Sequence, residues 1–337
     1  MTASENAAPG SGSDNSGNGA GTMGQRIRLA RIRDYGIVTA FVLLFAALSV
    51  TSPVFLTQTN LLNILDQNTE IGIIACGGTI VIIAGGFDLS VGAIFALAGV
   101  VAAEVAVHVG SVAGICAGLA AGLALGGVNG LIVTGLKINT FIATLASGYV
   151  FRGVATLITG GFLVTVTAAA FAIPGNYELF NVKFTVWIFA IVAIALGLLL
   201  SKTVFGRYIY AVGGNAEAAR LSGIRVSRVR ALTFVISGFC AGLAGVLAAS
   251  QDSTGAARGG LGIELAAIAA IVIGGTSIAG GEGAVWRSVL GVMLIALINN
   301  GFNLLDIDPF YQSVVQGLII LLAVSVDVWA RKAEGAS

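Results

Sequence analysis

Charged side chains are scarce in this sequence, and their scarcity excludes a soluble protein. Only 10% of the 337 residues are charged, whereas about 25% is usual for a soluble domain. Hydrophobic residues make up 57%, glycine occurs 48 times, and the mean hydropathy is +0.97. One domain cannot hide so much apolar surface from water, so lipid is the natural solvent for this chain. The net charge of +1 gives no reason to expect a nucleic acid partner.

Histidine and cysteine are also rare, which excludes several kinds of catalytic site. His108 is the single histidine, so neither a histidine-based metal cluster nor a Ser-His-Asp arrangement is easily built. Cys76, Cys116 and Cys240 lie inside apolar runs without metal-ligand spacing, so we interpret them as small packing residues. HExxH and GxSxG are absent, and Gly197–Thr203 (GLLLSKT) imitates a phosphate-binding loop without its second glycine. We predict no metal, no cofactor and no enzyme activity.

Long apolar runs predict an all-α fold, a polytopic membrane helix bundle. Residues 1–25 are rich in glycine, serine and asparagine and are predicted to form a disordered cytoplasmic tail. Residues 26–337 then form the transmembrane domain. A span needs about 20 apolar residues. About ten transmembrane segments are predicted, at 36–51, 62–85, 90–108, 111–135, 140–158, 184–201, 231–250, 263–275, 284–304 and 310–329.

The positions of lysine and arginine predict the orientation, because these residues gather on the cytoplasmic side. With the N and C termini both cytoplasmic, only Arg152, Lys183 and Arg258 of the 17 basic residues fall elsewhere. The longest cytoplasmic loop is then 201–230.

Two apolar segments are short and end in a Gly-Gly pair. The apolar residues between Glu70 and Gly85, and those between Glu264 and Gly274, are too few to cross a core of about 30 Å at 1.5 Å per residue. Short segments interrupted by glycine mark the central site of many transporters. We therefore predict two glycine-broken helices. The candidate gate residues are Gly85, Gly86, Asp88 and Ser90 at the first break, and Gly274, Gly275, Thr276 and Ser277 at the second.

Asp88 and Ser90 stand where a new helix begins. Either side chain is able to accept hydrogen bonds from unpaired backbone N–H groups there, as a helix N-cap does. A gate, or a contact for a passing polar solute, is the alternative. The two roles are compatible, and both stay open.

Glycine recurs at every fourth position along 111–135. Small residues at this spacing let another helix backbone approach closely. Packing within one polypeptide is favoured over a subunit interface. The glycines are Gly110, Gly114, Gly118, Gly122, Gly126 and Gly130.

The loop 201–230 contains the signals of a short exposed helix. Asn215 is the predicted N-cap, AEAARL consists of strong helix formers, and Gly223 ends the helix. Several arginines follow. We favour docking into a groove on another protein over a loop that is merely basic.

Several motifs in order resemble one family, the permease subunits of ribose/xylose/galactose-type ATP-binding-cassette (ABC) sugar importers. They are GGTIVIIAGGFDLSVGAIFAL, NTFIATLASGYVFRG, EAARLSG and GGTSIAGGEG, and the likeness runs from Pro53 to Lys332. Glycine is usual in the family where Arg287 stands, so packing after the second break is expected to differ.

The resemblance implies a permease of a bacterial-type inner membrane that imports a monosaccharide or related polyol. It implies a homodimer of permeases embedded in lipid, an extracytoplasmic sugar-binding protein, and partner ATPase subunits that use the ATP. The implied ATPase-coupling residues are Asn215, Glu217, Ala218, Ala219, Arg220 and Gly223. Polar residues are costly in lipid unless they face inward, so the candidate substrate path contains Asn129, Asn139, Thr140, Asn299, Asn300 and Asn303, with Thr276 and Ser277.

Two other functions remain open. A proton-coupled secondary carrier could use Glu104 and His108, which are four residues apart, although an interfacial pair that reaches water is the simpler interpretation. A membrane scaffold without transport is the third possibility. Asp66 and Glu70 share a helix face at the outer boundary and are predicted to form a solvated acidic rim, with the orientation of an extracellular partner by charge complementarity as the alternative.

Overall fold

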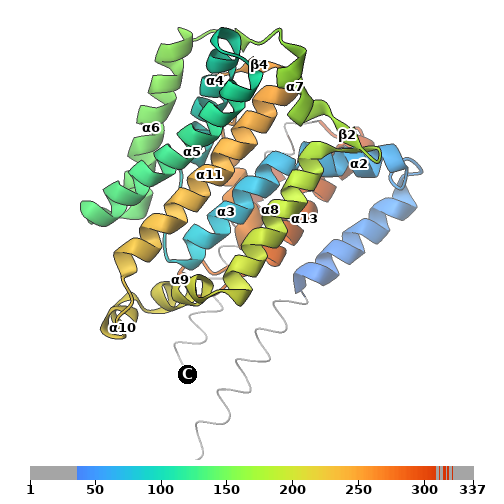
Figure 1. Cartoon of the computed structure of the whole chain (residues 1–337). Coiled ribbons are helices and arrows are strands. Elements are labelled where there is room, and N and C mark those ends of the chain that lie inside the picture. The colour runs from blue at the N-terminus through green and yellow to red at the C-terminus, as the bar shows by residue number, and fades with distance from the viewer. Residues whose placement is uncertain (1–35, 309–310, 312–313, 316, 319–320, 322–337) are drawn as a thin grey trace, which may run out of the picture.

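Helices carry most of the chain in the computed structural model, which describes residues 36–308, 311, 314–315, 317–318 and 321. Within these residues, six helices are long and apolar enough to cross a membrane. They are α4 (Val91–His108), α5 (Ser111–Gly135), α6 (Thr140–Thr159), α8 (Phe184–Lys202), α11 (Val226–Asp252) and α13 (Val285–Leu304) (Figure 1). Three shorter apolar helices accompany them, Gly36–Thr51, α3 (Thr69–Ile83) and α12 (Ile263–Ile273).

The predicted span 62–85 is wrong in one respect, because it is not one continuous helix. The chain leaves helical geometry at Asn68 (φ −109°, ψ 6°), which separates α2 (Gln58–Gln67) from α3. Asn68 Nδ2 donates to the Ile64 carbonyl at 2.8 Å and so stabilises the bend. The predicted tail 1–25 and most of the predicted span 310–329 lie outside the described residues.

Helices α3, α4 and α11 form the centre of the bundle. Helix α4 is buried along most of its length, and α11 packs against α3, α4 and α5. Cys76 and Cys240 lie in this core as predicted, whereas Cys116 is exposed. The outer helices expose large side chains, such as Tyr149 and Leu157 of α6. Apolar side chains exposed in such number are stable only against lipid or another protein surface.

The glycines of α5 pack against helices of the same chain, as predicted. A Cβ atom on Gly122 would lie 2.7 Å from the Gly238 carbonyl oxygen, and one on Gly126 would overlap that of Phe234. Gly114, Gly118 and Gly130 face α4 or α11 in the same way, whereas Gly110 meets nothing within 4 Å. Glycine is needed here because two helix backbones touch.

Different small elements close the two ends of the bundle (Figure 1). At one, the α7 end, α7 (Ala169–Asn176) packs on α11, because Ser250 Oγ accepts from the Gly175 N–H at 2.8 Å. Two antiparallel strand pairs accompany it. At the other, the α10 end, lie α9 (Val204–Gly214) and α10 (Ala216–Leu221). The strands are β1 (Val164–Thr165) with β4 (Thr254–Gly255), and β2 (Glu178–Leu179) with β3 (Val182–Lys183).

The prediction of a solvated acidic rim is wrong for Asp66. Its side chain is only 11% exposed and forms an ion pair with Lys183 at 2.6 Å. Thr185 Oγ1 also donates to it at 3.0 Å. Because Lys183 is the residue before α8, this pair ties the start of α8 to the end of α2.

Candidate transport and coupling site

Three Gly-Gly pairs from distant parts of the chain meet at the α10 end. The first follows α3, the second lies in the loop after α12, and the third ends α9. Gly281 N donates to the Ile83 carbonyl at 2.8 Å. A Cβ on Gly280 would lie 2.9 Å from Gly85 Cα and 3.1 Å from the Gly213 oxygen, and one on Gly213 would overlap the Ile83 oxygen. We call Gly85, Gly213, Gly280 and Gly281 the glycine junction.

The second break lies at the predicted position, because α12 ends at Gly274 and Gly275 follows with a left-handed φ of 81°. Gly274 takes no part in the glycine junction and packs on the main chain of α13, where its Cβ would lie 2.5 Å from the Arg287 oxygen. Helix α12 therefore approaches α13 at the main chain of Arg287. Because the side chain of Arg287 takes no part in this contact, the close approach does not require glycine at position 287. Thr276 and Ser277 are buried in the same loop.

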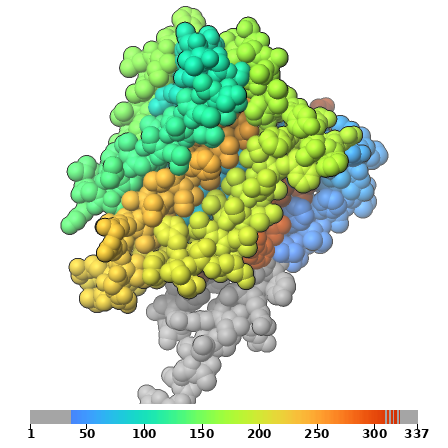
Figure 2. All heavy atoms as spheres, in the orientation of Figure 1, coloured from blue at the N-terminus to red at the C-terminus, as the bar shows by residue number. Residues whose placement is uncertain are grey.

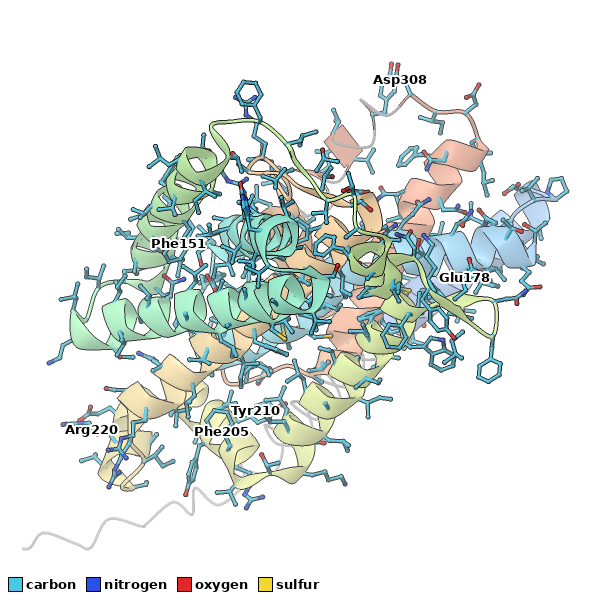
Figure 3. All side chains as sticks on the ribbon, turned by 45° about the horizontal axis from the view of Figure 1, so that its top comes forward. Phe151, Glu178, Phe205, Tyr210, Arg220 and Asp308 are labelled. Atoms are coloured by element: carbon cyan, nitrogen blue, oxygen red, sulfur yellow. The ribbon has the colours of Figure 1, made fainter. Side chains whose placement is uncertain are left out.

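A tyrosine adds a second link between α9 and the loop after α12. Tyr210 Oη donates to the Gly283 carbonyl at 2.8 Å. Burial raises the pKa of the Tyr210 hydroxyl, and the Arg287 guanidinium opposes that rise. Figure 3 shows Tyr210 nearer to the middle of the molecule than Arg220. Helix α9 is therefore held to the second break by both main-chain and side-chain contacts.

Helix α10 has the capped and exposed form that the sequence predicted. Asn215 Oδ1 accepts from the N–H groups of Glu217 and Ala218 at 3.1 and 2.9 Å. Gly223 follows the helix with a left-handed φ of 84°, which favours glycine. Ala219 packs inward, whereas Leu221 is 78% exposed.

Glu217 and Arg220 pair on the outer face of α10 at 2.6 Å. The hydrogen bond from Arg220 lowers the pKa of Glu217. Both side chains stay largely exposed, and α10 stands out from the bundle in the space-filling view (Figure 2). Glu217, Arg220 and the apolar Leu221 are therefore all exposed on α10.

Asp88 lies at the centre of a buried polar network at the first break. Its Oδ1 accepts from the Ser90 N–H at 3.1 Å and also from the Ser90 hydroxyl, and its Oδ2 accepts from Ser237 Oγ at 2.8 Å. Asn129 Nδ2 donates to Ser90 Oγ at 2.6 Å. Of the two candidate caps, Asp88 accepts a backbone N–H at the start of α4, whereas Ser90 occupies the N-cap position but its side chain makes no capping bond. Asp88 also ties the break to α5 and α11.

Replacing Ser237 with alanine is expected to lower the free energy of unfolding by about 1.5–3 kcal/mol, because it removes a buried hydrogen bond to a carboxyl group. The matched control is Ser147→Ala, since Ser147 is also buried but donates only to a carbonyl of its own helix. Denaturant unfolding of the purified variants measures both effects. Equal losses of unfolding free energy in the two variants would show that the hydrogen bond from Ser237 to Asp88 is worth no more than one within a single helix.

The candidate substrate-path residues lie in separate places. Asn139 and Thr140 line a cavity beside Gly85, and Thr140 Oγ1 accepts from the Phe87 N–H at 3.1 Å. Asn129 belongs to the Asp88 network. Asn300 pairs with Asn60 of α2 at 2.8 and 3.2 Å, and Asn299 and Asn303 lie near it on α13.

Glu104 and His108 lie at the surface of the α7 end. The two side chains approach to 3.5 Å, and the ring of His108 is 72% exposed. A proton relay through a bundle needs groups in its interior. The exposure of this pair argues against the carrier alternative.

Comparison with known proteins assigns the chain to a family. The sequence model of one family, described as the branched-chain amino acid transport system / permease component, matches residues 60–324. The chain belongs to this permease family. This permease is therefore a multi-pass inner-membrane transport component rather than an enzyme, and a carrier function is not favoured.

Individual relatives cover nearly the whole permease. The ribose import permease protein RbsC of Escherichia coli (strain K12) is 42% identical over 293 residues, which are 86% of this chain and 91% of that protein. The L-arabinose transport system permease protein AraH of the same strain is 39% identical over 94% of this chain and 97% of its own length. The L-arabinose ABC transporter permease protein AraH of Azospirillum brasilense is 39% identical over 88% of both chains. No solved structure matches the chain.

Proposed function

We propose that this permease imports a monosaccharide of the pentose class as the membrane subunit of an ABC importer. Ribose and L-arabinose are the named substrates of the relatives, which supports this class. ATPase subunits dock on α10, and an extracytoplasmic sugar-binding protein delivers the sugar at the α7 end. The α10 end therefore faces the cytoplasm, in agreement with the distribution of basic residues.

In the proposed mechanism, α10 passes the movement of the ATPase subunits directly to α9, because the two helices follow one another in the chain. Asn215 alone separates the two helices, and α9 ends in the glycine junction. Because main chain touches main chain there, α9 is unable to move without displacing the segments after α3 and after α12. Closure of the ATPase subunits thus reaches both breaks through one contact.

A pair of identical permeases forms the complete path in this proposal. Of the candidate path residues, Asn139 and Thr140 line the cavity beside Gly85 and the others do not, whereas apolar outer faces remain for contact with lipid or a second copy. Irregular backbone at membrane depth is tolerated where protein covers it or a wet cavity adjoins it. A path between two copies meets that requirement.

Reconstituted vesicles test the function. Vesicles that contain the permease, its ATPase and its binding protein should take up labelled ribose or arabinose only when ATP is supplied. A protonophore should have no effect. Uptake without ATP, or uptake that a protonophore stops, would contradict the proposal.

Replacing Leu221 with aspartate is expected to reduce uptake at least about tenfold, because a charge would replace an exposed apolar group on the proposed docking surface. Insertion and thermal stability should not change, since the side chain is 78% exposed. Leu136→Asp is the control, being 67% exposed beyond the end of α5 and outside α10. Pull-down of the ATPase measures docking; equal binding by both variants would rule out α10 as the contact.

A further inference from the structure

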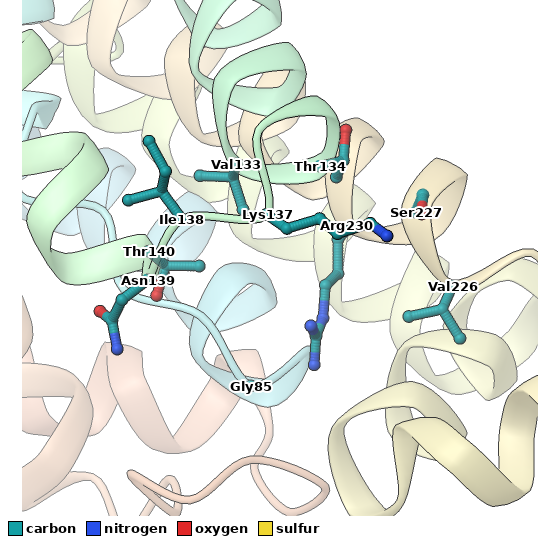
Figure 4. Close-up of a pocket in the computed structure, with 10 residues that line it drawn as sticks. All are labelled: Gly85, Val133, Thr134, Lys137, Ile138, Asn139, Thr140, Val226, Ser227 and Arg230. Atoms are coloured by element: carbon teal, nitrogen blue, oxygen red, sulfur yellow. The ribbon is translucent and has the colours of Figure 1, made fainter.

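A cavity of about 370 Å³ opens at the α10 end, between the α5–α6 connection and the first turn of α11 (Figure 4). Its lining is polar and carries two basic side chains with no carboxylate. The lining residues are Gly85, Val133, Thr134, Lys137, Ile138, Asn139, Thr140, Val226, Ser227 and Arg230.

The two basic residues lack partners in the described part of the chain. Arg230 Nε is shielded from water yet has no hydrogen-bond acceptor, and neither Arg230 nor Lys137 forms an ion pair with a described residue. By contrast, Arg152 donates to the carbonyls of Ala257 and Gly259. A guanidinium nitrogen shielded from water without an acceptor is costly. An anionic ligand would remove that cost.

The backbone around the cavity supports the same conclusion. Lys137 adopts a left-handed φ of 55°, a conformation that glycine and asparagine adopt more readily. Helix α11 begins at the cavity without a side-chain cap, so its first N–H groups and Ser227 add donors on the side of the positive helix dipole.

We propose that this cavity binds a phosphate group, carried either by an anionic lipid headgroup or by a soluble phosphate ester. Arg230 and Lys137 neutralise the charge, and Ser227 with the start of α11 donates hydrogen bonds to the oxygens. A neutral sugar would leave both cations uncompensated. Gly85 also lines the cavity, where a Cβ on it would lie 3.7 Å from Arg230 Nη2, so a bound phosphate would adjoin the glycine junction.

The test compares two sources of phosphate on the full-length permease. Inorganic phosphate is titrated by calorimetry against the detergent-purified protein at constant ionic strength. Separately, the permease is recovered from vesicles of phosphatidylcholine with phosphatidylglycerol, and the lipid that co-purifies is quantified. Saturable phosphate binding without lipid enrichment assigns a soluble ester. Enrichment of phosphatidylglycerol, with or without such binding, assigns the headgroup.

Variants establish that the cavity is responsible. Arg230→Gln and Lys137→Gln should each weaken binding roughly tenfold or more, since each removes a charge-assisted contact. Arg230→Lys keeps the charge and should lose less, which separates binding from misfolding. Lys202→Gln is the matched control, because Lys202 is an exposed cation at the end of α8 outside the cavity. Absence of both kinds of binding, or an equal loss in Lys202→Gln, would overturn the proposal.

Discussion

Replacing Gly213 with alanine is expected to abolish sugar uptake. The new methyl group would overlap the Ile83 carbonyl oxygen and lie 2.6 Å from the Gly281 nitrogen. Both are main-chain atoms, and these are unable to move aside as the end of a flexible side chain would. Helix α9 would therefore have to separate from both broken segments, and ATPase closure would no longer reach them. Crowding of a packed interior typically costs 1–3 kcal/mol or more.

Gly214→Ala is the matched control for this experiment, because a Cβ on that neighbouring residue meets nothing within 4 Å. Uptake of labelled ribose or arabinose and ATP hydrolysis are measured on the same vesicles. We expect Gly213→Ala to hydrolyse ATP without importing sugar and Gly214→Ala to behave as the wild type. Normal import by Gly213→Ala would show that the junction does not transmit movement.

Replacing Gly126 with valine should prevent the permease from folding stably. Its Cβ would overlap the Phe234 carbonyl oxygen and lie 2.9 Å from Gly238 Cα. Helices α5 and α11 would be forced apart along the contact on which the bundle depends. We expect a loss above about 3 kcal/mol, the upper part of the range for crowded cores. Most proteins have only about 5–15 kcal/mol of total stability.

Gly127→Val is the control, because the next residue along α5 has open space for a side chain. It carries the same change in helix propensity, so the difference between the variants reports packing alone. Size-exclusion chromatography and thermal unfolding in detergent measure it. Similar unfolding temperatures would mean that α5 and α11 adjust to the added volume.

Local signals made much of the fold predictable. Apolar runs bounded by polar residues predicted α4, α5, α6, α8, α11, α12 and α13, and the cap at Asn215 with the stop at Gly223 predicted α10, whereas α7 and α9 were not predicted. The recurrence of glycine at every fourth position predicted the close packing of α5. Each of these signals lies within a few residues of the element that it describes, which is why sequence alone was enough.

Contacts between distant segments were not predictable. Gly213 and Gly280 are 67 positions apart, and nothing near either one indicates the other. Asp66 looked solvated because its partner Lys183 lies beyond five intervening helices. Asp88 was recognised as unusual together with its neighbour Ser90, but its other donor, Ser237, comes from a distant part of the chain. Sequence shows which polar groups are costly, and only the fold shows what satisfies them.

The direct backbone contact at the glycine junction also affects the leakage of small solutes and ions across the membrane. Flexible side chains between two segments would absorb the first part of any displacement. Peptide groups in direct contact transmit the displacement from its start. In the proposed import cycle, both broken helices would then shift together, and no intermediate would have only one of them displaced. Such synchrony would let small polar molecules cross only as cargo and keep the ion gradients of the cell intact.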